Sequence, residues 1–114
     1  MEINEESYKI WYETDTATVN FQGALRLSGI EEYKPITQLL NDLANQDLPT
    51  ITLNLKKLEF LNSSGISMLS KFVIDVRKKQ TSQMIIVGSK EIPWQGKSLK
   101  NLQRLMPGLT LELT

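Results

Sequence analysis

The sequence predicts a single α/β domain with a mixed, mostly parallel β-sheet, an N-terminal β-hairpin and three helices, in the order ββαβαβαβ. Three observations predict this class. The length of 114 residues fits one domain. Apolar residues alternate in some segments and recur at helical spacing in others. After the first two strands, helices and strands take turns, which requires crossover connections and therefore parallel strand pairs.

The predicted hairpin consists of strands at 8–13 and 17–23. In the second strand, Val19 and Phe21 alternate with polar neighbours, a period of two that is typical of a half-buried strand. The Thr-Asp-Thr sequence at 14–16 is short enough to form the turn between them.

Residues 1–7 are expected to be a loose tail, so that the folded domain covers 8–114. This end is acidic and has no basic segment followed by an apolar one, as a secretory signal would have. The chain contains no cysteine, which fits a reducing compartment, and we expect a cytoplasmic protein. No apolar run approaches the roughly 18 residues that a membrane span needs.

The first helix is predicted at 31–46, where one apolar stripe recurs at helical spacing. The stripe consists of Ile36, Leu39, Leu40 and Leu43. Pro35 is expected in the first turn of this helix, because proline there removes no helical hydrogen bond.

A strand at 50–58 and a helix at 63–79 follow. The strand alternates, and the helix carries an inward stripe and ends in three basic residues that favour the helix dipole. The stripe consists of Ile66, Leu69, Phe72, Val73 and Val76.

The last three elements are a strand at 83–88, a helix at 97–106 and a strand at 109–113. The strand at 83–88 is a continuous apolar run, which predicts that both faces of the sheet are covered there. Pro107 and Gly108 end the helix.

Composition excludes several kinds of chemistry. Without cysteine or histidine, the chain has no disulfide, no thiolate nucleophile and no Cys/His zinc site. Ser-His-Asp catalysis is excluded as well, because no imidazole can accept the serine proton. The net charge is zero, but basic residues concentrate in the second half of the chain. A solvated face explains them; nucleic-acid binding by a basic patch is the alternative.

The Asn62-Ser63-Ser64-Gly65 motif joins the third strand to the second helix. Asn and Ser are favoured N-caps, because their side-chain oxygens accept hydrogen bonds from free N–H groups at a helix start. Capping does not explain Gly65, since glycine in a first turn costs about 1 kcal/mol relative to alanine. Close approach by the backbone of another molecule is the alternative explanation for it.

The same position suits a phosphate group. A helix N-terminus offers unpaired N–H groups and the positive end of the dipole. A phosphoserine adds about −1.5 to −2 charges. The fold would tolerate this modification while the surface changed strongly, as a binding switch requires.

The element order and the stretch "LNLKKLEFLNSSGISMLSKF" (53–72) resemble the STAS domain, the fold of bacterial anti-sigma-factor antagonists. The resemblance covers about residues 8–114. It implies a non-enzymatic interaction module of partner-switching signalling and transcription regulation, without a cofactor or a metal. In such antagonists a serine kinase, which is also the anti-sigma factor, phosphorylates the serine after an Asp. The unphosphorylated form binds that kinase and releases the sigma factor, and a serine phosphatase resets the cycle.

By position, Ser63 matches the phosphorylated serine. Asn62, Ser64 and Gly65 would form the acceptor loop and contact the partner. Asn62 departs from the family pattern, which has Asp there, and so removes a negative charge beside the acceptor. A STAS scaffold that is never phosphorylated, with Ser63 only a cap, is therefore an alternative.

An alternative of another class is nucleotide binding by "WQGKS" at 94–98, which follows a strand and opens a helix. The P-loop pattern requires a glycine five residues before Gly96, and Glu91 stands there instead. A structural role is favoured, in which Trp94 packs at the core edge and Lys97 lies on the solvent side. Sequence leaves the oligomeric state open.

Overall fold

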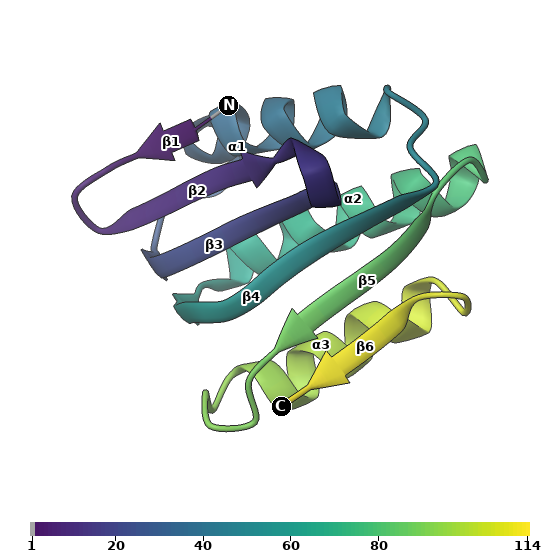
Figure 1. The fold of residues 1–114 in the computed structure, drawn as a ribbon. Helices are drawn as coiled ribbons and strands as arrows, with labels where there is room; N and C mark the ends of the chain where they lie inside the picture. The colour runs from purple at the N-terminus through teal and green to yellow at the C-terminus, as the bar shows by residue number, and fades with distance from the viewer. Residues whose placement is uncertain (1) are drawn as a thin grey trace.

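The computed structural model describes residues 2–114, which form one six-stranded sheet and three α-helices (Figure 1). The strands lie in the order β1-β2-β3-β4-β5-β6; the first two pairs are antiparallel and the others parallel. From β2 onward this confirms the predicted ββαβαβαβ order. The elements are β1 (Glu2–Asn4), β2 (Tyr8–Glu13), the 3₁₀ turn η1 (Thr14–Thr16), β3 (Thr18–Leu25), α1 (Gly29–Ala44), β4 (Thr50–Leu61), α2 (Ser63–Lys79), β5 (Gln83–Gly88), α3 (Gln95–Leu105) and β6 (Thr110–Leu113).

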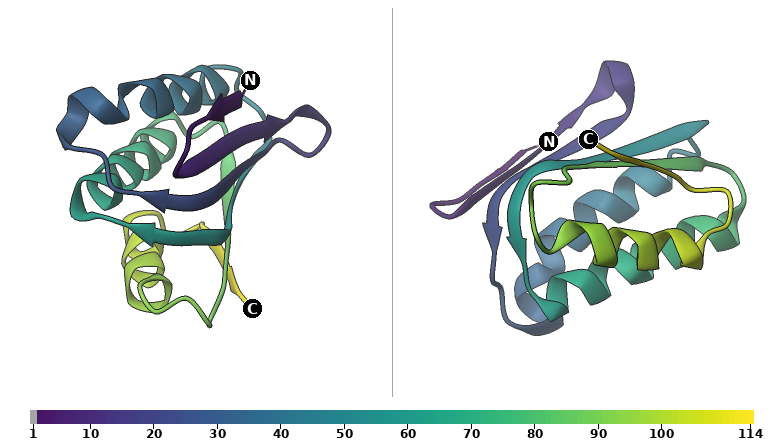
Figure 2. Two further views of the ribbon diagram at one scale, coloured as in Figure 1. Left: turned by 90° about the vertical axis from the view of Figure 1, so that its left-hand side faces the viewer. Right: turned by 90° about the horizontal axis from the view of Figure 1, so that it is seen from below.

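All three helices cover the same face of the sheet (Figure 2). Successive parallel strands are neighbours, and right-handed crossovers that advance in one direction place their helices on one side. The prediction that 83–88 is covered on both faces is therefore wrong. Met84 and Ile86 are buried under the helices, whereas Ile85 and Val87 are only half-buried on the opposite face.

The expected loose tail at 1–7 is also wrong for residues 2–4, which form β1; Met1 lies outside the described residues. Glu2 pairs with Trp11 and Asn4 with Lys9 in an antiparallel ladder. The chain can fold back here because Gly23 has a φ of +97°, and a Cβ at Gly23 would collide with the backbone of the β1–β2 turn.

Helix α1 begins earlier than predicted, so Pro35 is its seventh residue rather than part of its first turn. Ser28 is the N-cap, and its N–H donates to Glu32 Oε1 at 2.8 Å, which stabilises the earlier start. Pro35 removes the N–H that would bond to the Glu31 carbonyl. Both residues are exposed, so water can satisfy that carbonyl.

Strand β4 runs three residues beyond the predicted end. Its register opposite β3 shifts so that three residues of β4 face two of β3, a β-bulge that exposes both Lys56 and Lys57. The alternation of apolar and polar residues breaks at this bulge. For that reason the sequence pattern predicted too early an end for the strand. The extension carries the chain to Leu61, which pairs with Leu25 at the end of β3, so Asn62 follows at the same edge of the sheet.

Candidate functional site at the start of helix α2

Asn62 is the N-cap of helix α2, one of the two residues that the sequence offered for this role; the alternative that Ser63 is the cap is wrong, because Ser63 is the first residue of the helix. Its backbone is extended (φ −80°, ψ 176°), and its Oδ1 accepts a hydrogen bond from the Gly65 N–H at 2.9 Å. The Asn62 carbonyl accepts from the Ile66 N–H at 3.0 Å, which is the first bond of the helix. These bonds fix the start of α2 relative to the end of β4.

The Asn62 side chain also joins this helix start to two other segments. Its Nδ2 donates to the Leu27 carbonyl at 2.8 Å, and its Oδ1 accepts from the Tyr33 hydroxyl at 2.7 Å. The backbone N–H of Asn62 donates to the Leu25 carbonyl at 3.2 Å. One asparagine thus ties α2 to the β3–α1 loop and to α1, using the donor and the acceptor of its amide.

Tyr33 is the partner that sequence reasoning missed. Its side chain is 1% exposed, and burial raises the pKa of its hydroxyl above the ordinary value. The hydroxyl therefore stays protonated and donates to Asn62. The available signal was a tyrosine three residues before Ile36 in the apolar stripe of α1, because a buried tyrosine hydroxyl normally has a hydrogen-bond partner.

Gly65 has an internal explanation. It is buried, and a Cβ built on it would overlap the Leu61 side chain and lie 2.7 Å from the Tyr33 hydroxyl. The glycine therefore admits atoms of its own chain. The interpretation that it admits the backbone of another molecule is wrong.

The two serines face outward from this locked loop. Ser63, the first residue of α2, is exposed, and Ser64 is half-buried. No acidic side chain lies in the first turn of α2, so the positive end of the dipole is not neutralised within that turn. The four predicted site residues thus divide into an internal pair, Asn62 and Gly65, and an outward pair.

A groove between α1 and α2, the α1–α2 groove, opens beside this loop. Its volume is about 470 Å³, and Ser64 lies at the end where both helices begin. Ile30, in the first turn of α1, borders the groove and is 88% exposed. Phe60, two residues before Asn62, is 38% exposed, with the Arg26 guanidinium 4.7 Å from its ring centroid. These two are the exposed large apolar side chains of residues 2–114.

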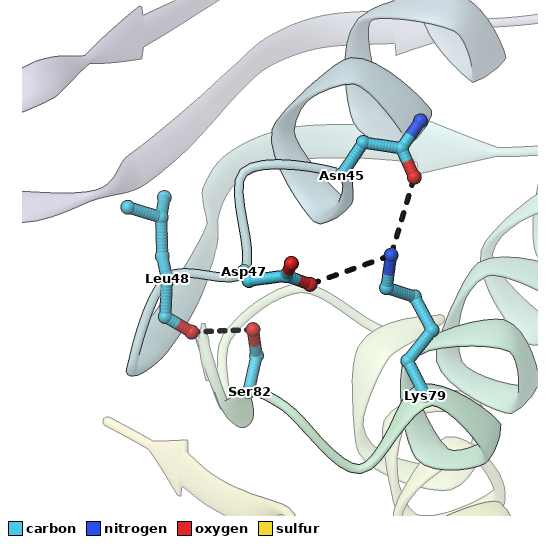
Figure 3. A network of polar contacts seen from close by, with 5 residues as sticks. All are labelled: Asn45, Asp47, Leu48, Lys79 and Ser82. Carbon is cyan, nitrogen blue, oxygen red and sulfur yellow. Dashed lines mark hydrogen bonds and ion pairs between the residues drawn. The ribbon is translucent and has the colours of Figure 1, made fainter.

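A second polar network joins the C-terminal ends of α1 and α2 (Figure 3). Lys79 Nζ lies 3.5 Å from Asp47 Oδ1 and donates to Asn45 Oδ1 at 3.2 Å. Ser82 Oγ donates to the Leu48 carbonyl. Polar contacts therefore connect the two helices and their flanking loops at both ends of the groove.

The 94–98 segment is used structurally. Gln95 is fully buried; its Nε2 donates to the carbonyls of Leu55 (2.6 Å) and Leu58 (3.0 Å), and its Oε1 accepts from the Ser89 N–H (2.7 Å). Trp94 Nε1 donates to the Leu58 carbonyl at 3.1 Å. The loop thus closes over the end of the bulged part of β4.

Several N–H groups of this loop are not free to cradle a phosphate. Those of Ser89, Glu91, Ile92 and Gln95 are already bonded within the loop. Lys97 is exposed, as predicted. No observation favours nucleotide binding here.

Comparison with known proteins identifies the family of this domain. The model of the STAS domain family matches residues 13–104. The chain belongs to the STAS domain family. No curated protein matches this STAS domain. Among residues 2–114, no helix is long and apolar enough to cross a bilayer.

Solved structures similar to this STAS domain include SiaC of Pseudomonas aeruginosa, with a TM-score of 0.73, 9% identity, and coverage of 100% of this chain and 96% of that one. A chain of the crystal structure of diguanylate cyclase SiaD in complex with its activator SiaC, from the same organism, has a TM-score of 0.73 and 10% identity, covering 100% and 99%. An anti-sigma factor antagonist from Mycobacterium paratuberculosis has a TM-score of 0.69 and 19% identity, covering 94% and 88%.

Proposed function

We propose that this STAS domain is a non-enzymatic, cytoplasmic protein-interaction module whose partner binding is switched by phosphorylation of Ser63. An anti-sigma-type serine kinase would be both the modifying enzyme and a binding partner, and a serine phosphatase would restore the unmodified form. The output would be transcription regulation by partner switching. The structural likeness to an anti-sigma factor antagonist and to the activator SiaC supports a function through protein partners.

The main support for the proposal is that the acceptor loop combines internal contacts with an exposed serine. Asn62 and Gly65 hold the loop from inside, while Ser63 is exposed at the first position of α2. A phosphate on Ser63 would therefore break none of the bonds around Asn62. It would meet the positive end of the α2 dipole, an interaction of about 0.3–1 kcal/mol at an exposed site.

The same phosphate changes the surface that a partner meets. It adds about −1.5 to −2 charges next to Ser64, which lines the α1–α2 groove together with the exposed Ile30. An apolar partner surface that docks there would have to desolvate the phosphate, at a cost that an unpaired buried charge does not recover. The modification thus blocks docking while the fold is kept.

The test is intact mass after incubation of the purified protein with ATP and lysate from its own cells. We expect one added phosphate in the wild type and none in Ser63→Ala. Ser7→Ala is the matched control, since Ser7 is exposed between β1 and β2, outside the lining of the α1–α2 groove, and should leave the modification unchanged. No added phosphate, in a lysate that phosphorylates another antagonist, would favour the constitutive scaffold. Phosphate that persists in Ser63→Ala would place the acceptor elsewhere.

A further inference from the structure

The shape of the α1–α2 groove matches a helix. Both helices follow parallel strands on one face of the sheet, so they run in the same direction, as Figure 2 shows. The groove extends from Ser64 to Asp75 on the α2 side. Eleven steps of about 1.5 Å give a length of about 17 Å, or three helical turns. A helix of another molecule can place its side-chain ridge into such a groove.

The charge of the groove indicates which chemistry it accepts. Its charged lining residues are Lys71 and Asp75, whose Nζ and Oδ2 atoms form an ion pair at 3.1 Å. The sum of their charges is zero, so the lining offers no excess charge to a phosphate or a nucleic acid. Apolar parts of Ile30, Met68 and Phe72 line the rest together with small polar groups. A stripe of uncharged, mainly apolar side chains complements this lining.

The groove and the acceptor loop form one continuous surface. Tyr33 lines the groove, and its hydroxyl donates to Asn62 Oδ1 at 2.7 Å. Ser64 belongs to both the loop and the groove. A partner seated in the groove therefore comes up against the residue beside Ser63.

We propose that the α1–α2 groove docks an amphipathic helix of a protein partner, about three turns long, whose apolar stripe lies between α1 and α2 and ends at Ser63. Such a helix uses anchors spaced i, i+3 or i+4, and i+7. This inference rests on the proposed function, because it names the binding mode of the partner that the Ser63 loop would control.

The experiment uses photo-crosslinking from two neighbouring positions of α1. Thr37 is half-buried in the groove, whereas Gln38 is exposed outside it. p-Benzoylphenylalanine replaces each residue in the full chain, expressed in the cells of origin, and crosslinked peptides are mapped by mass spectrometry. We expect crosslinks from position 37 to the apolar stripe of a helical partner segment and few from position 38. Equal yields at both positions, no crosslink at 37, or attachment to an extended segment or to a second copy of this chain would overturn the proposal.

Arginine substitutions then test the groove by competition. Thr37→Arg places a charge in the groove and should weaken capture of the mapped partner by about tenfold or more, as loss of an interface anchor does. Gln38→Arg should change it less than twofold. Should Thr37→Arg fail to fold, Ser67→Arg tests the opposite wall, where Ser67 is exposed. Undiminished capture by the folded groove variant would contradict helix docking.

Failure of this inference differs from failure of the phosphorylation switch. If Ser63 is phosphorylated but no groove-specific crosslinks form, the phosphorylation switch is supported and helix docking in the α1–α2 groove is contradicted. Groove-specific crosslinks that persist unchanged in Ser63→Asp would leave the groove standing and overturn the switch.

Discussion

Replacement of Asn62 by aspartate tests the network that holds the acceptor loop. The aspartate keeps an oxygen for the Gly65 N–H and the Tyr33 hydroxyl, but it loses the Nδ2 donor that bonds the Leu27 carbonyl at 2.8 Å. A carboxylate oxygen then faces a carbonyl oxygen. Loss of the donor and the unpaired carbonyl cost about 1–3 kcal/mol. The negative charge at the start of α2 returns about 0.3–1 kcal/mol. The loss is larger, so we expect Asn62→Asp to destabilise the domain by about 1 kcal/mol at pH 7.

The assay is thermal and urea unfolding of the wild type and of Asn62→Asp. About 1 kcal/mol corresponds to a decrease in Tm of about 4 °C for a domain of this size. Asn4→Asp is the control, because it makes the same chemical change at an exposed position in β1 and should stay within about 0.5 kcal/mol. The Asn62→Asp deficit should shrink below about pH 4, where a protonated carboxyl can donate to the Leu27 carbonyl again. An Asn62→Asp protein as stable as the wild type at pH 7 would refute the argument.

Three further predictions concern buried groups of the domain. Gly65→Ala should lower the unfolding free energy by about 1–3 kcal/mol in urea titrations, because its Cβ meets the side chains of Leu61 and Tyr33; a gain in stability would show that helix propensity decides at this position. Tyr33→Phe should flatten the loss of stability at alkaline pH. Because the pKa of Tyr33 is raised in the folded protein, its contribution to stability is complete below about pH 10 and is lost as the pH rises through the folded pKa. Between about pH 8 and about pH 11.5 the free energy of unfolding should therefore fall more steeply in the wild type than in Tyr33→Phe. Parallel curves for the two proteins would contradict this. Gln95→Ala should cost about 2–3 kcal/mol in thermal unfolding, since it leaves the Leu55 carbonyl unpaired in the interior, and a cost below about 0.5 kcal/mol would mean that water replaces the amide.

Elements with a strong apolar period were predictable from sequence. Helix 63–79 and strand 83–88 have the predicted bounds, because each pattern ends at a turn signal and no tertiary contact changes it. The N-cap role of Asn62 followed from the same local chemistry.

What could not be predicted depends on contacts between distant segments. Strand β1 has only three residues and forms because Gly23 lets the chain fold back against β2. The bond between Tyr33 and Asn62 joins residues 29 positions apart. Gly65 has its meaning only once α2 packs on Leu61. The three helices cover only one face of the sheet because of the strand order. An apolar run such as β5 does not contain information on the strand order.

Under the proposed function, phosphate on Ser63 controls partner binding without unfolding the domain. The most direct measurement is the Kd of the modifying kinase, determined by calorimetry, for the unmodified protein and for the protein phosphorylated on Ser63, with the Tm of both forms recorded. We expect binding at least about a hundredfold weaker for the phosphorylated form, or about 2.7 kcal/mol, with little change in Tm. Equal Kd values, or a phosphorylated form that has lost its cooperative unfolding transition, would contradict it.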